Sequence, residues 1–362
     1  MDQLTYVANF HDDDAVKKMS YQPLGNTGKP GLSLGNTGLS VSRISLGGGP
    51  LGDMYGSNKE EEYIATVHLA LKSGINYIDT APWYGNGRSE EVIGKALKDV
   101  PRSAYYIGTK VGRYEQDLEK QFDFSGKRVE QSVDASLKLL GLNYVDVIQV
   151  HDLEFAESLD IILEETLPAL QKVVEQGKAR HIGITGYPLY LLQEVIERSS
   201  INIELVLSYA RNTLLDDTLK EFIPFFQSRN IGVINAAAVS MGLLCHGNLV
   251  GWHPATQNIK DACQQAAQFC KATGVDLGRL AAQHSLKLDG VSTHLMGNNN
   301  TSILRKNLDS VLTPPTPLEE KVALELKLKF FDPLPRKHWE GVGPAQYWKS
   351  LRELRGELPQ ED

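Results

Sequence analysis

Short apolar segments alternate with amphipathic helical segments along most of this chain, and this alternation limits its possible folds more than any other feature. Segments that are apolar at nearly every position are typical of parallel strands buried on both faces. Between them, apolar residues recur three and four positions apart, as on one face of a helix. We predict strands at 43–47, 75–79, 105–109, 145–150, 180–184, 203–207, 231–236 and 291–295, and helices near 60–73, 89–98, 127–140, 165–176, 189–198, 216–229, 261–272 and 301–311.

Eight strand–helix units in succession favour a closed (β/α)8 barrel. An open, doubly wound sheet is the alternative, but that fold usually carries a GxGxxG phosphate-binding turn after its first strand. Here Gly47, Gly48, Gly49 and Pro50 stand at that place, without the required spacing. The predicted fold class is therefore α/β, a TIM barrel with an N-terminal β-hairpin and a C-terminal extension.

The hairpin is predicted from the sequence LGNTG, which occurs at 24–28 and again at 34–38. Gly and Asn tolerate positive φ, so each copy is typical of a turn. Near the C-terminus, Pro333, Pro335 and Pro344 interrupt the pattern, and a short final helix is expected near 345–356. The chain then divides into a flexible N-terminal segment, the barrel with its hairpin, and the C-terminal extension, at 1–20, 21–312 and 313–362.

Composition excludes several classes of partner. The 362 residues include 37 Lys and Arg against 45 Asp and Glu, a net charge of −8. Such a chain lacks the basic surface typical of nucleic-acid binding, and no apolar run approaches the roughly 18 residues of a membrane span. No secretory signal is visible at the start. Three cysteines without a CxxC pair favour the reducing cytoplasm, no metal-ligand spacing is seen, and the oligomeric state is left open.

Four ionisable residues stand at or just after the ends of three successive predicted strands. Asp79 ends one strand, with Tyr84 five residues later, and Lys110 and His151 follow the next two. The carboxyl ends of barrel strands form the face on which active sites lie. An ammonium close to a phenol lowers the pKa of the phenol. We therefore expect Asp79 to orient Lys110, Lys110 to lower the pKa of Tyr84, and His151 to hold a substrate oxygen.

Each of these residues also has an ordinary structural interpretation. A lone Asp after a strand is often a turn former or helix cap, a lone Lys is often solvated, and a lone His often serves packing. Their occurrence together at successive strand ends favours the catalytic interpretation.

Longer motifs are spread over residues 40–312. They are INYIDTAPWYG (75–85), SEEVIGKAL (89–97), IGTKVG (107–112), LKLLGLNYVDVIQVHD (137–152), LPALQKVVEQGKARHIGITGY (167–187) and VINAAAVSMGLL (233–244). With these motifs, residues 40–312 resemble the aldo-keto reductase superfamily, and most resemble its L-galactose dehydrogenase branch. The resemblance implies a catalytic tetrad of Asp79, Tyr84, Lys110 and His151, with Tyr84 as the proton donor. It also implies hydride transfer between C4 of a nicotinamide and a carbonyl or alcohol carbon.

The resemblance also implies where the cofactor lies. Many relatives end the fifth strand with Ser-Asn, whose side chains hold the nicotinamide carboxamide, whereas this chain has Thr185-Gly186. The family's stacking Tyr falls on Ala236. An ordinary turn at 185–186 and a loop that merely packs at 236–242 are the alternatives. The expected cofactor contacts are Gly48, Thr185, Gly186, Ala236, Ala238, Ser240, Met241, Gly242, Gly297, Asn299 and Asn307.

The choice of dinucleotide depends on residue 303. Relatives that prefer NADP place an Arg four residues before the Asn that matches Asn307, and here that position is Ile303. Without a guanidinium, a 2′-phosphate loses its best partner. This favours NAD, although NADP stays possible because Arg305 and Lys306 are near in sequence.

Polar and aromatic residues in the loops suit a small carbonyl or sugar-like substrate. Trp83, Arg113 and Trp252 are the candidate contacts, with a loop-anchoring role as the alternative for Trp83. The expected function is an NAD(P)-dependent oxidoreductase of the sugar (L-galactose-type) dehydrogenase kind. Two alternatives remain at this point: a Schiff-base aldolase that uses Lys110, and a cofactor-binding regulatory subunit with slow or vestigial reductase activity.

Overall fold

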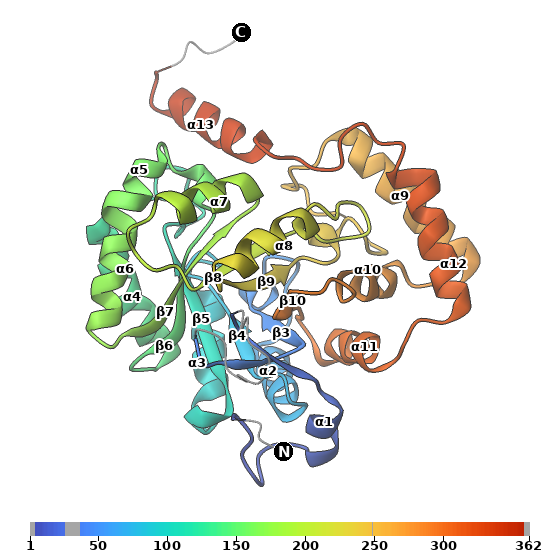
Figure 1. The fold of residues 1–362 in the computed structure, drawn as a ribbon, viewed down its shortest axis with the longest axis horizontal. Coiled ribbons are helices and arrows are strands. Elements are labelled where there is room, and N and C mark those ends of the chain that lie inside the picture. Colours follow the sequence, from blue (N-terminus) through green and yellow to red (C-terminus); the bar gives the residue numbers. More distant parts are fainter. Residues whose placement is uncertain (1–3, 26–36, 248, 358–362) are drawn as a thin grey trace.

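A computed structural model describes residues 4–25, 37–247 and 249–357 (Figure 1). Parallel strands form a closed barrel in the order β10-β3-β4-β5-β6-β7-β8-β9, so the predicted (β/α)8 barrel is confirmed. Each predicted barrel strand has a counterpart in the structure. The strands are β3 (Ile44–Gly47), β4 (Tyr77–Asp79), β5 (Tyr106–Val111), β6 (Val145–Val150), β7 (Ala179–Gly186), β8 (Leu205–Tyr209), β9 (Gly232–Ala236) and β10 (Thr293–Gly297).

Helices surround the barrel, as Figure 1 shows. In α4 (Gly126–Leu140), the Ser125 side chain caps the first turn and Gly141 ends the helix with a φ of 66°. The predicted inner stripe of this helix, from Val129 to Leu140, is buried. The other helices beside the strands are α2 (Glu60–Lys72), α3 (Arg88–Leu97), α5 (Leu159–Ile161), α6 (Leu167–Glu175), α7 (Leu189–Arg198), α8 (Leu219–Ser228), α9 (Gln257–Thr273), α10 (Leu277–Ser285) and α11 (Thr301–Leu312).

The N-terminal hairpin closes the bottom of the barrel. Strand β1 (Tyr21–Pro23) pairs antiparallel with β2 (Ser40–Ser42), which confirms the hairpin, while most of the two predicted LGNTG turns lies outside the described residues. Leu24 and Val41 join the apolar side chains inside the barrel. The carboxyl ends of the strands, where the expected catalytic residues stand, are thus the mouth of the barrel.

The N-terminal segment, expected to be flexible, is ordered over its described residues. Helix α1 (Asp13–Lys18) is capped by Asp12, whose backbone N–H donates to Lys72 O at 2.9 Å. Val16 and Met19 are buried, and Met19 belongs to the apolar cluster around the barrel. The polar composition of this segment concealed the helix and its two buried side chains.

Besides α1 and the short α5, two helices were not expected from the sequence. One is α10, capped by the Asp276 side chain; the other is α12 (Pro317–Leu326) in the C-terminal extension. Helix α12 begins with a capping box in which Thr316 and Glu319 bond each other's backbone, a signal present in the sequence. The expected final helix is α13 (Val342–Leu354).

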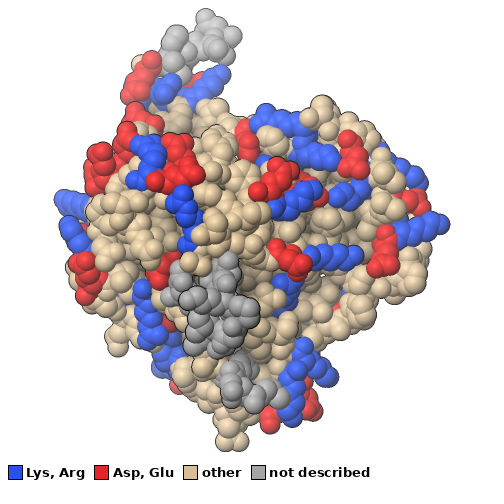
Figure 2. Space-filling view, in the orientation of Figure 1, with Lys and Arg blue, Asp and Glu red and all other residues tan. Residues whose placement is uncertain are grey.

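Charged side chains of both signs are interspersed over the face drawn in Figure 2. Among the residues that the structure describes, no helix combines the length and apolar character needed to cross a membrane.

Candidate active site

The four predicted catalytic residues meet at the barrel mouth. Asp79 ends β4, Lys110 lies in β5, His151 directly follows β6, and Tyr84 follows β4 in the turn before α3. The ammonium of Lys110 lies between two partners: it forms an ion pair with Asp79 Oδ1, and its Nζ is 3.4 Å from the Tyr84 hydroxyl. The rings of Tyr84 and His151 stand 5.6 Å apart. The structure therefore brings all four residues together.

Burial makes the lysine–carboxylate pair strong. Lys110 is only 1% exposed, and its Nζ also donates to Thr80 O at 3.0 Å. Although burial lowers the pKa of Lys110, Asp79 and Tyr84 raise it by more, so Lys110 stays charged at neutral pH. A fixed positive charge therefore faces the phenol oxygen.

The pKa of Tyr84 differs from the expectation. We expected Lys110 to lower it, but burial of the phenol raises the pKa and outweighs the opposing effect of Lys110. Tyr84 consequently holds its proton at neutral pH, as a proton donor must.

His151 is neutral at the same pH. Burial, together with the charges of Lys110 and Arg113, lowers the pKa of this imidazole well below its usual range. Its backbone N–H donates to Val111 O at 2.8 Å, which fixes the residue to the neighbouring strand. A neutral imidazole at this place can donate one hydrogen bond to a substrate oxygen.

Gln149, which the sequence analysis did not single out, extends the tetrad inside the barrel. Its Nε2 donates to Asp79 Oδ2 at 2.8 Å, and its Oε1 accepts from Thr185 Oγ1 at 3.2 Å. Gln149 stands in β6 two residues before His151, and this two-residue spacing, by which alternate side chains of an extended segment point the same way, was the available signal.

The substrate candidates Trp83 and Arg113 contact each other beside the tetrad. The guanidinium of Arg113 stacks 3.4 Å above the Trp83 ring and pairs with Asp152 Oδ2 at 2.5 Å. Trp83 also lies edge-on to His151, with ring centres 6.4 Å apart. Asp152 follows His151 directly, with φ of 51°, so the strained backbone aims its carboxylate back toward Arg113. The sequence did not indicate Asp152.

Trp252 is separate from that pair. It is 47% exposed and packs edge-on against Tyr55, with ring centres 5.7 Å apart. Tyr55 in turn lies close to Gly49, as does the Tyr84 ring. The contact places Trp252 near the rim of the mouth rather than in its interior.

The loop after β9 has an unusual backbone. Ala237, Ser240 and Met241 all have φ between 50° and 56°, and Gly242 has φ of 102°. Such conformations cost free energy and concentrate at functional sites. The Ser240 hydroxyl is buried and lacks a hydrogen-bond partner in the described structure, while its carbonyl lies 3.0 Å from His253 Nε2. Ala236 ends β9, and Ala238 is buried in the same loop.

The expected phosphate-side residues surround the start of α11. Gly297 ends β10, and Asn299 O accepts from Asn58 Nδ2 at 3.0 Å. Asn307 Nδ2 donates to Asn298 Oδ1 at 2.8 Å. The carboxylate of Glu62, from α2, accepts from both the backbone N–H and the hydroxyl of Thr301, at 2.8 and 2.9 Å. A negative charge therefore already stands at this helix N-terminus.

Two glycines permit close approaches at the mouth. A Cβ on Gly48 would lie 2.8 Å from both Asp79 O and Ser89 Oγ. A Cβ on Gly186 would lie 3.0 Å from Glu154 Oε2. These residues therefore have packing reasons to be glycine.

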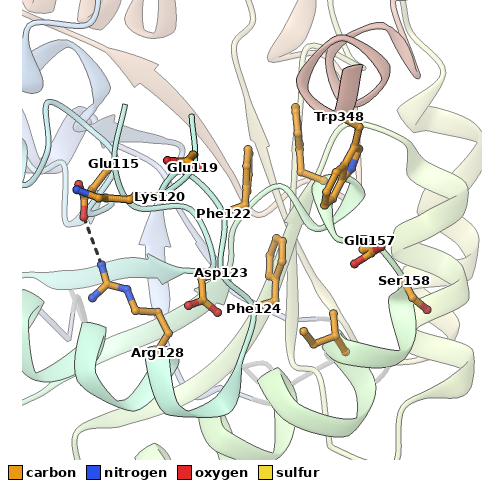
Figure 3. Close-up of a pocket in the computed structure, with 12 residues that line it drawn as sticks. Glu115, Glu119, Lys120, Phe122, Asp123, Phe124, Arg128, Glu157, Ser158 and Trp348 are labelled. Atoms are coloured by element: carbon orange, nitrogen blue, oxygen red, sulfur yellow. Dashed lines mark ion pairs between the residues drawn. The ribbon is translucent and has the colours of Figure 1, made fainter. Parts of the chain in front are cut away.

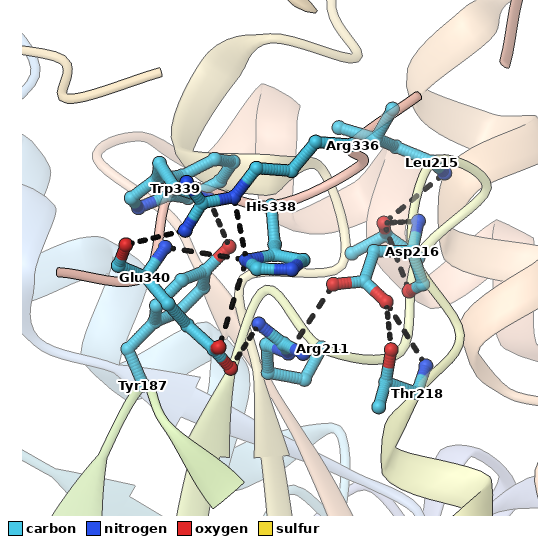
Figure 4. Close-up of polar contacts among 10 residues, drawn as sticks. Tyr187, Arg211, Leu215, Asp216, Thr218, Arg336, His338, Trp339 and Glu340 are labelled. Atoms are coloured by element: carbon cyan, nitrogen blue, oxygen red, sulfur yellow. Dashed lines mark hydrogen bonds and ion pairs between the residues drawn. The ribbon is translucent and has the colours of Figure 1, made fainter. Parts of the chain in front are cut away.

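The C-terminal extension crosses the mouth on the β7–β8 side (Figure 4). Trp339 is buried and stacks on Tyr187, with ring centres 4.8 Å apart. Glu340 pairs with Arg211 Nη1 at 2.7 Å, and Arg211 also contacts Asp216 at 3.2 Å. The backbone N–H and the hydroxyl of Thr218 both donate to the Asp216 carboxylate, which holds these residues in a turn. Helix α8 therefore begins at 219 and not at 216, the predicted start.

An aromatic groove lies next to Arg113, and none of the three predicted substrate residues is part of its lining (Figure 3). Phe122 and Phe155 stack with ring centres 4.4 Å apart, and Arg113 lies 5.1 Å above Phe122. Trp348 of α13 lines the groove on its other side. Within the described ranges, no cluster of three or more His, Cys, Asp or Glu could hold a metal ion.

Comparison with known proteins identifies the family of the chain. Residues 43–322 match the aldo/keto reductase family. The chain belongs to the aldo-keto reductase family, whose members are NAD(P)-dependent oxidoreductases.

Within that family, the chain is similar to named sugar dehydrogenases. It is 43% identical over 282 residues to L-galactose dehydrogenase from Arabidopsis thaliana, covering 77% of this chain and 87% of that protein. It is 31% identical to D-arabinose 1-dehydrogenase from Saccharomyces cerevisiae, covering 75% and 83%. Among solved structures, aldo-keto reductase AKR11C1 from Bacillus halodurans has a TM-score of 0.67 and 28% identity, covering 85% of this chain and 96% of that one. The resemblance noted from the sequence is confirmed.

Proposed function

We propose that this protein is an NAD-dependent dehydrogenase of small sugars, with Tyr84 as the group that exchanges a proton with the substrate oxygen. The observation that carries the proposal is the position of Lys110, buried between the Asp79 carboxylate and the Tyr84 hydroxyl. A bound nicotinamide dinucleotide would accept the hydride from the sugar carbon, and its reduced form would return the hydride in the reducing direction.

In this proposal each member of the tetrad has a separate task. In the reducing direction Tyr84 gives its proton to the carbonyl oxygen, and the charge of Lys110 stabilises the phenolate that remains. Asp79 keeps Lys110 charged and oriented. His151, neutral and fixed to β5, donates a hydrogen bond that places the substrate oxygen near Tyr84.

The residues at the mouth fit a dinucleotide. Thr185 and Gly186 would contact the nicotinamide, and the loop 236–242, with its buried and unpartnered Ser240 hydroxyl in the described structure, would contact the pyrophosphate. Gly48, Gly297, Asn299 and Asn307 would line the remainder of the site.

The preference for NAD has two supports. Ile303 is exposed and supplies no charge at the position where NADP-preferring relatives have an Arg. Hydrogen bonds from Thr301 lower the pKa of Glu62, which is therefore ionised. Its negative charge would repel a 2′-phosphate near the start of α11.

The sugar class is supported by the polar residues beside the tetrad and by the names of the relatives. Arg113, Asp152 and the Trp83 indole N–H, which has no partner among the described residues, offer donors and an acceptor for hydroxyl groups. The named relatives include L-galactose and D-arabinose dehydrogenases.

The test is reduction of NAD+ or NADP+ followed at 340 nm with a panel that contains L-galactose, other aldoses, and simple alcohols. The proposal expects turnover with sugars, and faster turnover with NAD+. Dinucleotide binding without turnover on any sugar would contradict it and support the regulatory-subunit alternative.

A further inference from the structure

Glu154 lies at the barrel mouth and has a buried carboxyl group. The mechanism proposed for the tetrad gives it no role. It lies after β6, three residues beyond His151, in the short segment Leu153–Phe155. Its Oε1 accepts from the backbone N–H of Tyr187 at 3.0 Å and from the Tyr209 hydroxyl at 3.1 Å. The ends of β7 and β8 thus fix the carboxyl group in one orientation.

The other carboxyl oxygen has no such partner. Oε2 is buried, and nothing in the described residues forms a hydrogen bond with it. A buried polar atom without a partner costs free energy, so its retention calls for an explanation. Oε2 lies beside Gly186, where a Cβ would come within 3.0 Å of it, so the glycine leaves room for this oxygen.

We propose that Glu154 Oε2 hydrogen-bonds the carboxamide of the nicotinamide, at the place where residue 186 has no side chain to do so. The inference rests on the proposed function, since it takes the dinucleotide to lie against Thr185 and Gly186. The anchors of Glu154 are Tyr187, which directly follows β7, and Tyr209, which ends β8, on the side of the proposed cofactor contacts. The substrate candidates Trp83 and Arg113 lie in the segments after β4 and β5 instead.

The protonation state of Glu154 decides whether Oε2 donates or accepts this hydrogen bond. Burial and the neighbouring Asp152 raise the pKa of Glu154 to about 8. At neutral pH the group is then mostly a neutral acid. Because Oε1 already accepts two hydrogen bonds, Oε2 carries the O–H and donates to the carboxamide oxygen.

The experiment measures dissociation constants for three probes: NAD+, its thionicotinamide analogue, and ADP-ribose, which lacks the nicotinamide. The variants are Glu154→Leu, which has no donor, and Glu154→Gln, whose amide can donate from the same position. Glu157→Leu, an exposed acid three residues along, is the matched control.

We expect Glu154→Leu to bind NAD+ roughly tenfold more weakly, the loss of about one hydrogen bond. Its affinity for ADP-ribose should stay unchanged, which also shows that the variant is folded. Glu154→Gln and Glu157→Leu should bind NAD+ within about twofold of the wild type. The wild type should bind the thio analogue more weakly than NAD+, since sulfur is a weak acceptor, and Glu154→Leu should lose this discrimination.

Wild-type affinity for NAD+ in Glu154→Leu would overturn the inference while leaving the proposed function intact. So would an equal loss of NAD+ and ADP-ribose. A raised KM for sugar with unchanged NAD+ affinity would also overturn it, and would place Glu154 in the sugar site. Failure of the wild type to bind NAD+, NADP+ or ADP-ribose would instead overturn the proposed function, and the inference with it.

Discussion

Gln149 holds the second oxygen of Asp79: its Nε2 donates to Asp79 Oδ2 at 2.8 Å, while Oδ1 faces Lys110. The buried carboxylate therefore has both oxygens occupied. The other end of the same amide accepts from Thr185, so the tetrad is joined to the end of β7. Gln149 touches no reacting atom, and we assign it a positioning role.

Replacement of Gln149 by Met should slow turnover by about 10- to 100-fold, because a hydrogen bond to a charged group contributes about 1.5–3 kcal/mol. The Met side chain has similar length but cannot orient Asp79. A merely structural role would leave the pH–rate profile unchanged. If Asp79 is less well oriented, the limb of the profile that reports the pKa of Tyr84 should shift. Gln131→Met, an exposed change on α4, should leave both rate and profile as in the wild type.

Cofactor choice should respond to charge at the start of α11. The double variant Ile303→Arg and Glu62→Gln adds a guanidinium and removes a carboxylate, so it should bind NADP+ at least about tenfold more tightly than the wild type does. Affinity for NAD+ should change little. Fluorescence titration with both dinucleotides checks this, and unchanged NADP+ affinity would show that the 2′-position lies elsewhere.

The preference for NAD+ over its thionicotinamide analogue should fade as pH rises through about 8. Glu154 has a raised pKa, so below that value it keeps its proton and donates to the carboxamide oxygen. Above it, the ionised Oε2 accepts from the carboxamide NH2, which both probes share. The other titratable or charged groups that face it are Asp152 in the same loop, Tyr209 of β8 and Tyr190 of α7, with Arg113 beyond Asp152. Glu154→Gln should keep the preference between pH 7 and 9, because its amide donates at every pH, and a wild-type pH profile in that variant would refute the assignment.

Glu90 should make stability depend on pH. Burial raises its pKa to about 7, although Thr109 donates to Oε1 at 2.6 Å. The folded protein keeps this proton at pH values where the unfolded chain has lost it, so the free energy of unfolding falls between about pH 4.5 and 7. Glu90→Gln removes this dependence. Its stability relative to the wild type should rise by up to about 3 kcal/mol from pH 4.5 to 8, measured by denaturant unfolding. An unchanged difference would contradict the raised pKa.

The barrel, and the meeting of Asp79, Tyr84, Lys110 and His151 at its mouth, could be predicted because both depend on local patterns. Buried parallel strands are apolar at nearly every position, and the polar residue that closes each strand is easily located. The order of residues 4–20 could not be predicted, because only Val16 and Met19 anchor a polar segment. Helix α12 was missed although Thr316 and Glu319 carry a capping signal.

The supporting residues of the site were hidden for a different reason. Gln149 and Glu154 acquire their roles only from partners on other strands, Asp79 and Thr185 in one case and Tyr187 and Tyr209 in the other. The pKa of Tyr84 was expected to fall because the charge of Lys110 could be anticipated, whereas the extent of burial could not.

The most direct test of the account is the turnover of Tyr84→Phe, measured beside its affinity for NAD+. Removal of one hydroxyl deletes the proposed proton donor and leaves the residues proposed to hold the dinucleotide unchanged. We expect kcat with a sugar substrate to fall by at least about 100-fold, NAD+ affinity to stay within about twofold, and the exposed control Tyr190→Phe to behave as the wild type. Wild-type turnover in Tyr84→Phe would contradict the assignment of Tyr84 and the mechanism built on it.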